Sequence, residues 1–145
     1  MKALLQRVSC AQVEVDHQCV GRIDRGLLVF LGLERGDDQQ AADRLLKKIL
    51  TYRVFSDADG RMNLSVTDAQ CEVLLVSQFT LAADTSKGLR PGFSSAMPPV
   101  EAEPLYLYTL DKLRSMHGEA AAGVFGADMQ VSLTNDGPVT FLLEA

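Results

Sequence analysis

The apolar segment 26–33, GLLVFLGL, constrains the fold more than any other part of this sequence. A continuous run of this kind, bounded by glycines, predicts a strand that is buried on both faces of a sheet. The run is far too short to cross a bilayer. Segment 71–81, CEVLLVSQFTL, repeats the apolar pattern and ends in polar residues. We therefore expect two buried strands within one sheet.

Two amphipathic helices are expected beside the strands. Residues 37–40, DDQQ, are typical of a helix start, and two rows at i,i+4 spacing follow, which are Ala41/Leu45/Ile49 and Ala42/Leu46/Leu50. A second helix is expected from about Glu101 to Met116, stopped by Gly118. Its apolar stripe consists of Ala102, Tyr106, Leu110 and Leu113.

Further strands are predicted at both ends of the chain. Segments 2–8, 11–16 and 19–24 alternate or are rich in β-formers. Near the C-terminus, Met129–Thr134 and Val139–Leu143 flank the turn-like residues 135–138, NDGP, which predicts a hairpin. Segment 82–99 is rich in Gly, Pro and Ser and is expected to be a long loop, and long loops are often functional.

The order of these elements predicts an α+β fold. With 145 residues the chain is expected to form a single domain over residues 1–145. The sheet is expected to be mostly antiparallel or mixed and barrel-like, with two main helices, because the strands and helices do not alternate regularly.

The charge balance narrows the possible partners. The chain has 14 basic and 19 acidic residues, a net charge of −5, which argues against a sequence-independent nucleic-acid binder. Two local basic clusters, Arg44/Lys47/Lys48/Arg53 and Lys87/Arg90, are interpreted as solvated surface. No secretory or membrane segment is apparent, and three scattered cysteines suggest reduced thiols, so a cytoplasmic protein is expected, without a membrane or DNA partner.

Few side chains suit conventional catalysis. The two histidines, His17 and His117, have no neighbouring nucleophile in the sequence, and no common hydrolase, metal or nucleotide motif occurs. The pair Asp57 and Asp59 before Gly60 indicates a hairpin turn rather than a calcium loop, because the later calcium ligands are missing. We expect no metal and no cofactor.

The segment 77–80, SQFT, lies where a buried strand leaves the core, which is a common place for site residues. Ser77 or Thr80 could act as a nucleophile, although a hydroxyl needs an activating base. Alternatively, these residues position a ligand through hydroxyl, amide and backbone groups. They could also simply satisfy the end of a strand.

A proline in an unusual place belongs to a second motif. Pro138 follows Gly137 where a strand would normally begin, and it lacks the N–H needed for a sheet ladder. SQFTL at 77–81 together with NDGPVT at 135–140 resembles the two signature motifs of bacterial D-aminoacyl-tRNA deacylases. Stretches 6–8, 26–33, 60–66 and 90–96 agree with this family over nearly the whole chain, although Gly92 stands where a serine is more often expected.

The resemblance implies the fold of this family and a cytosolic homodimer with two sites at the subunit interface. It implies hydrolysis of the ester between a D-amino acid and the 3′-terminal adenosine of tRNA, and removal of glycine mischarged onto alanine tRNA. In the family, a cis Gly-Pro unit of one subunit enters the partner's pocket beside SQFT. Gly137 and Pro138 would then exclude L-amino acids through rigid main-chain carbonyls.

The resemblance also assigns supporting roles. Catalysis would involve Ser77, Gln78, Phe79 and Thr80, either with Thr80 as nucleophile or with the ribose 2′-hydroxyl activating water and amides near Phe79 and Thr80 stabilising the oxyanion. The resemblance and the lack of acid–base side chains favour the RNA-assisted route.

Three further positions bear on substrate binding. Phe125 and Met129 would line an adenine pocket or belong to the core, and Arg7 would orient the Gly-Pro motif. Two alternatives remain at this point: a non-catalytic dimeric module that binds a nucleotide or D-amino acid, and a general esterase that depends on a histidine.

Overall fold

The computed structural model describes residues 1–145. The sheet strands are β1 (Lys2–Val15), β2 (Gln18–Ile23), β3 (Gly26–Gly32), β6 (Glu72–Ser77), β7 (Ala121–Ala122) and β8 (Gln130–Glu144), and β4 (Phe55–Ser56) with β5 (Met62–Leu64) forms a small hairpin. The helices are α1 (Gln39–Thr51), α2 (Pro99–His117) and a short 3₁₀ turn, η1 (Phe79–Ala82). The prediction of two main helices and two buried strands is confirmed, as is the turn at Gly60, but the strand predicted over 71–81 ends at Ser77 and is followed by η1.

The sheet is mixed and curls towards closure. Its order is β2–β1–β3–β6–β7, with β8 on the other side of β1; β3, β6 and β7 are parallel neighbours, and the pairs made by β1 are antiparallel. A Cβ on Gly21 of β2 would lie 2.5 Å from the carbonyl oxygen of Ala122 in β7, so the two ends of the sheet touch where only glycine fits. The barrel-like prediction is therefore correct.

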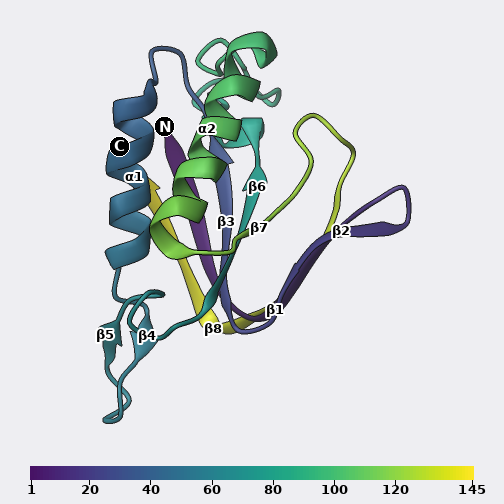
Figure 1. The fold of residues 1–145 in the computed structure, drawn as a ribbon. Helices are drawn as coiled ribbons and strands as arrows, with labels where there is room; N and C mark the ends of the chain where they lie inside the picture. The colour runs from purple at the N-terminus through teal and green to yellow at the C-terminus, as the bar shows by residue number, and fades with distance from the viewer.

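The buried central strands face two separate cores. Both long helices lie against one face of the sheet (Figure 1), and 28 buried residues fill the space there, including Leu27 and Val29 of β3. Leu28 of β3 and Leu74 of β6 face the other way, into a cluster of seven buried residues inside the curled sheet. Two cores explain why segments 26–33 and 71–81 are apolar on both faces.

The helices begin and end for the reasons that the sequence suggested. Asp38 caps α1, and its carboxylate accepts a hydrogen bond of 2.8 Å from the Ala41 amide. Gly118, with φ of 98°, ends α2 in a conformation that favours glycine. The predicted stripes of both helices are buried. Neither helix is long and apolar enough to cross a membrane.

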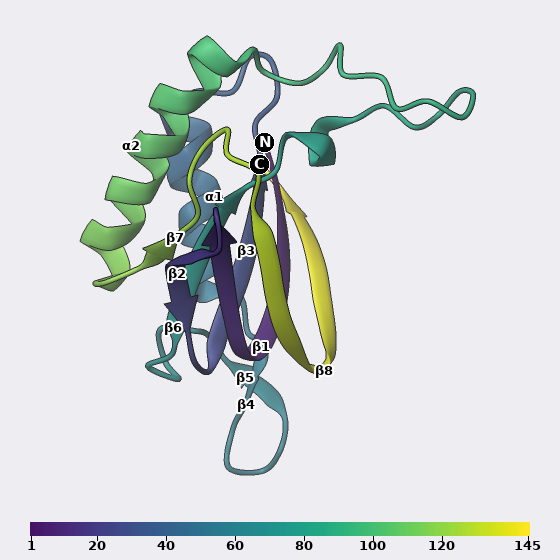
Figure 2. The same cartoon turned by 90° about the vertical axis from the view of Figure 1, so that its right-hand side faces the viewer.

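The prediction of a C-terminal hairpin is wrong. Both predicted strands belong to β8, and both pair antiparallel with the same partner, β1, as Figure 2 shows. The register shifts in the middle, so that residues 136–139 of β8 lie opposite Arg7 alone. The turn-like residues therefore form a bulge within one bent strand, because a distant strand supplies the pairing that the local pattern assigned to a hairpin.

Candidate functional site

A largely apolar cavity of about 570 Å³ lies beyond the C-terminal ends of β3 and β6. Twelve of its sixteen lining residues are hydrophobic, so it suits a flat or apolar group more than a charged one. The lining comes from several elements, and its residues are Leu31, Leu33, Val76, Ser77, Gln78, Phe79, Phe93, Ala96, Met97, Pro99, Ala102, Phe125, Gly126, Ala127, Met129 and Val131.

Most of the predicted site residues meet at this cavity. Ser77, Gln78 and Phe79 border it from the end of β6 and the start of η1, and Phe125 and Met129 border it from the chain before β8. The first three residues lie about 50 positions before the other two in the sequence, and the parallel pairing of β3, β6 and β7 brings the two groups together. The structure thus places the first motif beside Phe125 and Met129.

Thr80 lies just outside the lining and is exposed. The side-chain amide of Gln78 donates a hydrogen bond of 2.5 Å to the Thr80 hydroxyl oxygen. An amide that donates to this oxygen cannot also remove its proton, so Gln78 orients the hydroxyl without activating it as a nucleophile.

Neither histidine borders the cavity. His117, at the end of α2, has its Nε2 atom 2.8 Å from the carbonyl oxygen of Cys71, which precedes β6. His17 lies in the turn between β1 and β2 with a positive φ of 62°. Both belong to other parts of the fold, so the cavity has no histidine to serve as a base.

Backbone amides add further polar groups at the mouth of the cavity, next to the side chains of Ser77 and Gln78. η1 begins at Phe79, its cap residue Gln78 makes no side-chain capping bond, and the first hydrogen bond of the turn is donated by Leu81. The amides of Phe79 and Thr80 precede that bond and have no partner inside the turn. They are donors that an oxygen of a bound molecule could use.

Aromatic contacts define the rim and the rear wall. Phe79 is 60% exposed and packs against Phe93 with 5.0 Å between ring centroids. Phe125 packs against the buried Tyr106 at 5.7 Å, so Phe125 borders the cavity and also extends the core. The Tyr106 hydroxyl donates to the Leu75 carbonyl at 3.1 Å, and burial raises its pKa to about 12.

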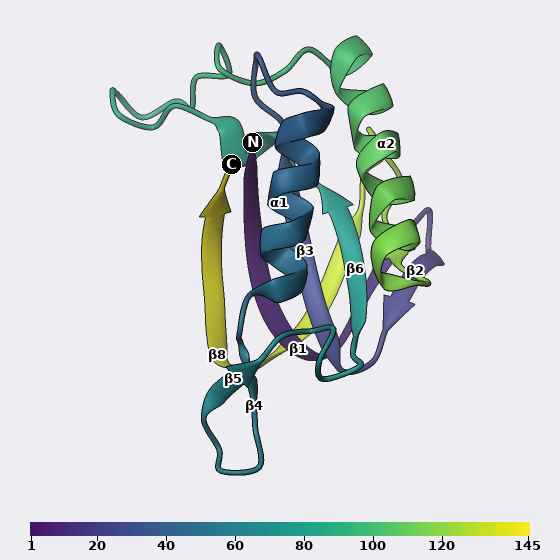
Figure 3. The same ribbon diagram turned by 60° about the vertical axis from the view of Figure 1, so that its left-hand side comes forward.

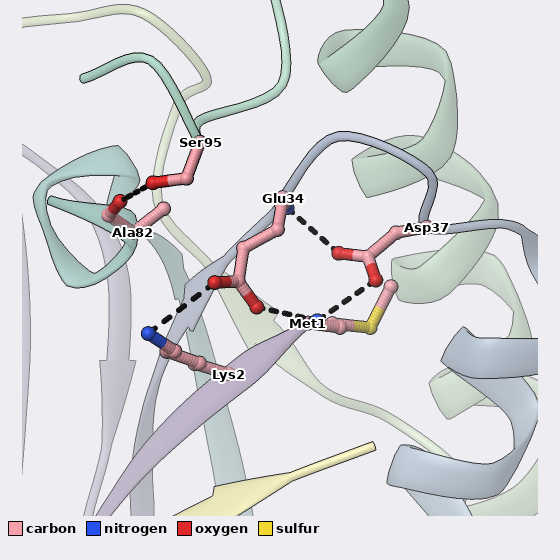
Figure 4. A network of polar contacts seen from close by, with 6 residues as sticks. All are labelled: Met1, Lys2, Glu34, Asp37, Ala82 and Ser95. Carbon is pink, nitrogen blue, oxygen red and sulfur yellow. Dashed lines mark hydrogen bonds and ion pairs between the residues drawn. The ribbon is translucent and has the colours of Figure 1, made fainter. Parts of the chain in front are cut away.

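A network at the N-terminal end of β1 supports the wall of the cavity (Figure 4). The Met1 ammonium is 2.8 Å from carboxylate oxygens of both Glu34 and Asp37. Burial favours a lower pKa for this ammonium, but its bonds to the two carboxylates outweigh burial and raise the pKa. Burial likewise favours a higher pKa for Glu34, and the ammonium and Lys2 outweigh it and lower the pKa.

This network reaches the cavity through the loop before α2. Glu34 pairs with Ala96 in an isolated bridge, and the Met97 amide donates to the Leu33 carbonyl at 3.0 Å. Ser95 donates from its hydroxyl to the Ala82 carbonyl at the end of η1. Ala96 and Met97 therefore have fixed positions in the lining.

The second motif forms the bulge of β8. The Asn135 side chain bridges its base: Nδ2 donates to the Val139 carbonyl at 3.1 Å, and Oδ1 accepts from the Val139 amide at 2.8 Å. The Gly137–Pro138 peptide bond is cis. A Cβ on Gly137 would lie 2.3 Å from the Val139 nitrogen, so only glycine fits.

Arg7 of β1 holds the bulge from the opposite strand. Its Nε donates to the Asp136 carbonyl at 2.9 Å, and its Nη1 donates to the Val54 carbonyl at 2.6 Å. The Arg7 side chain is only 12% exposed, and its Nε also lies 3.4 Å from an Asp136 carboxylate oxygen. A charged donor shared between two carbonyls ties the bulge to the chain before β4.

The two motifs of one chain lie at opposite ends of the sheet (Figure 2). Ser77 is level with Leu31, which pairs with Ala3, whereas the bulge lies opposite Arg7. Four residues of strand correspond to about 13 Å along β1. The structure therefore does not bring Gly137 and Pro138 to the cavity of their own chain.

Several residues that shape the cavity and the bulge are not predicted by the sequence pattern. The sequence pattern assigns Asn135 to a turn, whereas its side chain bridges the bulge that the β1–β8 register creates. Ala96, Met97 and Pro99 line the cavity although they lie in a segment expected to be a loop. At Gly92, a Cβ would come no closer than 3.7 Å to another residue, so the departure from serine is sterically neutral.

Known proteins resemble this chain over nearly its whole length. The sequence profile of the family described as D-Tyr-tRNA(Tyr) deacylase matches residues 4–144. D-aminoacyl-tRNA deacylases of Stutzerimonas stutzeri (strain A1501) and Cellvibrio japonicus (strain Ueda107) are 61% and 58% identical over 145 and 144 residues, covering 100% and 99% of both chains.

Solved structures agree as well. A structure titled c-Myc DNA Unwinding Element Binding Protein matches with a TM-score of 0.96 and 44% identity, over 100% of this chain and 99% of the other. A probable eukaryotic D-amino acid tRNA deacylase has the same fold at 16% identity, with a TM-score of 0.87 over 99% and 98% of the two chains. Because the curated relatives are named as deacylases, a hydrolase is favoured over a non-catalytic binding module. The chain belongs to the D-Tyr-tRNA(Tyr) deacylase family of enzymes that act on aminoacyl-tRNA.

Proposed function

We propose that this enzyme hydrolyses the ester of D-aminoacyl-tRNA in a cavity that a second copy of the chain completes. The observation that carries the proposal is the separation of the two motifs. The cavity beside Ser77 and Phe79 is open, and the rigid bulge at Gly137 and Pro138 lies at the far end of the same sheet. A homodimer with two-fold symmetry can place each bulge in the other subunit's cavity, which gives two identical sites.

The terminal adenosine of the tRNA is the group that the cavity suits best. A volume of about 570 Å³ with a hydrophobic lining accommodates a flat base and a ribose. Phe125 and Met129 would contact the base, since aromatic and thioether side chains pack well against π-systems. Only the 3′ end needs to be gripped, which an acidic chain with a net charge of −5 can tolerate.

Selection against L-amino acids follows from the bulge. A filter that serves many amino acids cannot depend on the side chain itself, so it senses the direction in which that side chain leaves Cα. The bulge is held by Arg7 and Asn135, and its carbonyls would collide with a substituent on the L side. Glycine has no side chain to exclude, so glycine mischarged onto alanine tRNA would also be removed.

The chemistry rests on positioning rather than on a protein base. We place the ribose 2′-hydroxyl of the terminal adenosine in the role of activating a water molecule. The water attacks the ester carbonyl carbon, the bond to the 3′ oxygen breaks, and that oxygen leaves with a proton as the 3′-hydroxyl. The Phe79 and Thr80 amides would stabilise the oxyanion, because they are donors without a partner inside η1. Charged tRNA is a cytoplasmic substrate, so the proposed activity belongs there.

A paired assay tests the activity and its selectivity. The enzyme is given D-Tyr-tRNA and L-Tyr-tRNA, and release of the D-amino acid alone is expected; equal rates would overturn the chirality filter. Replacing the terminal adenosine by its 2′-deoxy form should abolish turnover, whereas Thr80→Ala should retain most of it. The reverse pattern would identify Thr80 as a nucleophile.

Mixing two inactive variants tests whether the sites are shared. Gly137→Ala disturbs the bulge, and Ala127→Trp fills the cavity. If each site combines two chains, subunit exchange should restore about a quarter of wild-type activity, because half of the dimers are mixed and each has one intact site. If each site lies within one chain, the mixture stays inactive.

A further inference from the structure

An extended segment, residues 83–95, projects from the body of the molecule, as Figures 2 and 3 show, and its residue Phe93 lines the cavity. We call this segment the arm. It connects η1 to the loop before α2. Backbone hydrogen bonds of 2.8 and 2.9 Å join Asp84 and Gly92 across its base, so the arm leaves the body as a narrow double strand of chain.

The base of the arm is fixed to the mouth of the cavity. Phe93 packs against Phe79, and both border the cavity. The Arg35 guanidinium donates from Nε to the Ser94 carbonyl at 2.9 Å, and the Arg35 amide donates to the Ser95 carbonyl at the same distance. A molecule that emerges from the cavity therefore passes close to the arm.

Asp84 accepts a hydrogen bond of 2.9 Å from the Ser86 amide, but the cationic side chains of the arm have no partner within the chain. Every residue from Asp84 to Pro91 is exposed, and Leu89 is 104% exposed. Lys87 and Arg90 take part in none of the five ion pairs, which are formed by other groups. Two long cationic side chains without a partner are available to an anion.

The charge of the arm differs from that of the rest of the molecule. The arm has two basic residues and one acidic residue, a net charge of +1, whereas the whole chain has −5. A polyanion is repelled by most of this surface and attracted to the arm. The tip has no aromatic side chain for stacking on bases, so its contacts would be with phosphates and independent of sequence.

We propose that the arm is an RNA-binding element in which Lys87 and Arg90 contact phosphates of the tRNA 3′ strand while the terminal aminoacyl-adenosine occupies the cavity. The inference rests on the proposed function, because that function places the 3′ end in the cavity. Four residues of extended chain beyond the Asp84–Gly92 bridge reach about 13 Å, enough to pass the terminal nucleotide. Sequence-independent contacts suit an enzyme that acts on many tRNAs.

The salt dependence of kcat/KM for D-Tyr-tRNA tests the proposal. The slope of log kcat/KM against log salt is negative, and each lost phosphate contact on a single strand reduces its magnitude by about 0.7. The double variant Lys87→Ala/Arg90→Ala should therefore reduce the magnitude of the slope by about 1.4. Raising salt from 50 to 200 mM should therefore cost the variant about sevenfold less than the wild type. The effect should lie in KM, with kcat unchanged.

Lys47→Ala/Arg53→Ala is the matched control, because it removes the same charge from exposed residues near the C-terminal end of α1. If the arm variant and the control variant have the same slope of log kcat/KM against log salt, the proposal is overturned. Dissociation of the oligomer in size-exclusion chromatography with light scattering would also overturn it, since the arm would then be a subunit contact. If the wild type shows no D-selectivity, the proposed function fails instead, and that result is distinct from an unchanged slope.

Discussion

The mouth of the cavity and the bulge of β8 are built in opposite ways. At the mouth, Phe79 and Thr80 are exposed, and their amides have no partner inside η1. At the bulge, the side chains of Arg7 and Asn135 bind backbone groups on both sides of Gly137. One region has unsatisfied groups that a ligand can use, and the other uses its polar groups to hold itself in place.

This difference matches the two tasks that the proposed function assigns to these regions. A reacting ester needs donors that remain free until the substrate arrives. A steric filter needs a backbone that does not yield, because its discrimination is only as good as its rigidity. A chain that separates the two tasks onto opposite ends of one sheet can alter either without disturbing the other.

The largest effect is expected from Gly137→Ala, which breaks the rigid side of the comparison. The new Cβ would lie 2.3 Å from the Val139 nitrogen, and that nitrogen is bonded to Asn135. The displaced backbone should lower kcat/KM for D-Tyr-tRNA about 100-fold or more. Gly92→Ala is the control, because its Cβ has room, and equal activity of the two variants would contradict the steric argument.

Arg7→Ala should have the next largest effect, and on stability as well as activity. It leaves the Asp136 and Val54 carbonyls without a charged donor in a site where Arg7 is only 12% exposed. A loss of about 2–4 kcal/mol in the free energy of unfolding is expected from urea titration. The free energy of unfolding of Arg7→Lys should lie between those of the wild type and Arg7→Ala, since a single ammonium cannot reproduce the guanidinium geometry. Wild-type stability of Arg7→Ala would show that the bulge holds itself.

Alkaline titration probes the rear wall of the cavity through Tyr106. Its folded-state pKa is raised to about 12 from an ordinary value of 10, so its contribution to stability is complete below pH 10 and is lost as the pH rises towards 12. Two pKa units correspond to about 2–3 kcal/mol. Tyr106→Phe should cost about 1 kcal/mol at neutral pH and should flatten this alkaline loss. An unchanged alkaline slope in the variant would assign the loss to other groups.

The smallest stability effect is expected at the open side, for Phe79→Ala. Because Phe79 is 60% exposed, its removal should change the free energy of unfolding by less than about 0.5 kcal/mol. KM for D-Tyr-tRNA should rise all the same, since the ring forms the rim with Phe93. Phe125→Ala is the comparison: it should lower stability by more than Phe79→Ala, because Phe125 packs against the core. Equal stability losses would remove the distinction.

Local pattern was enough to predict much of the fold. The buried strands β3 and β6 and both helices follow from apolar runs and i,i+4 rows, which depend on short stretches of sequence. The prediction of a C-terminal hairpin was wrong because residues 135–138 have the chemistry of a turn, while the strand that pairs with them, β1, lies more than 110 residues away. Pairing over such a distance leaves no local trace.

The candidate site was predictable in part for the same reason. Ser77 and Gln78 were found because a buried strand ends there, and they do border the cavity. Thr80 was assigned to the same segment, yet η1 turns it out of the lining. The bridging role of Asn135 depends on side-chain hydrogen bonds across a register shift, which no spacing rule expresses.

The position of β1 in the sheet has a consequence for biosynthesis. β1 is translated before β2, β3 and β8; it can pair with β2 and β3 soon afterwards, but its pairing with β8 waits until β8 has been translated. At ribosomal rates, the roughly 115 residues between them take about 6 to 23 s to translate. Throughout that interval one edge of a 14-residue strand has no partner, and open edges of this kind pair with other chains. Nascent β1 is therefore exposed to misassembly on crowded polysomes.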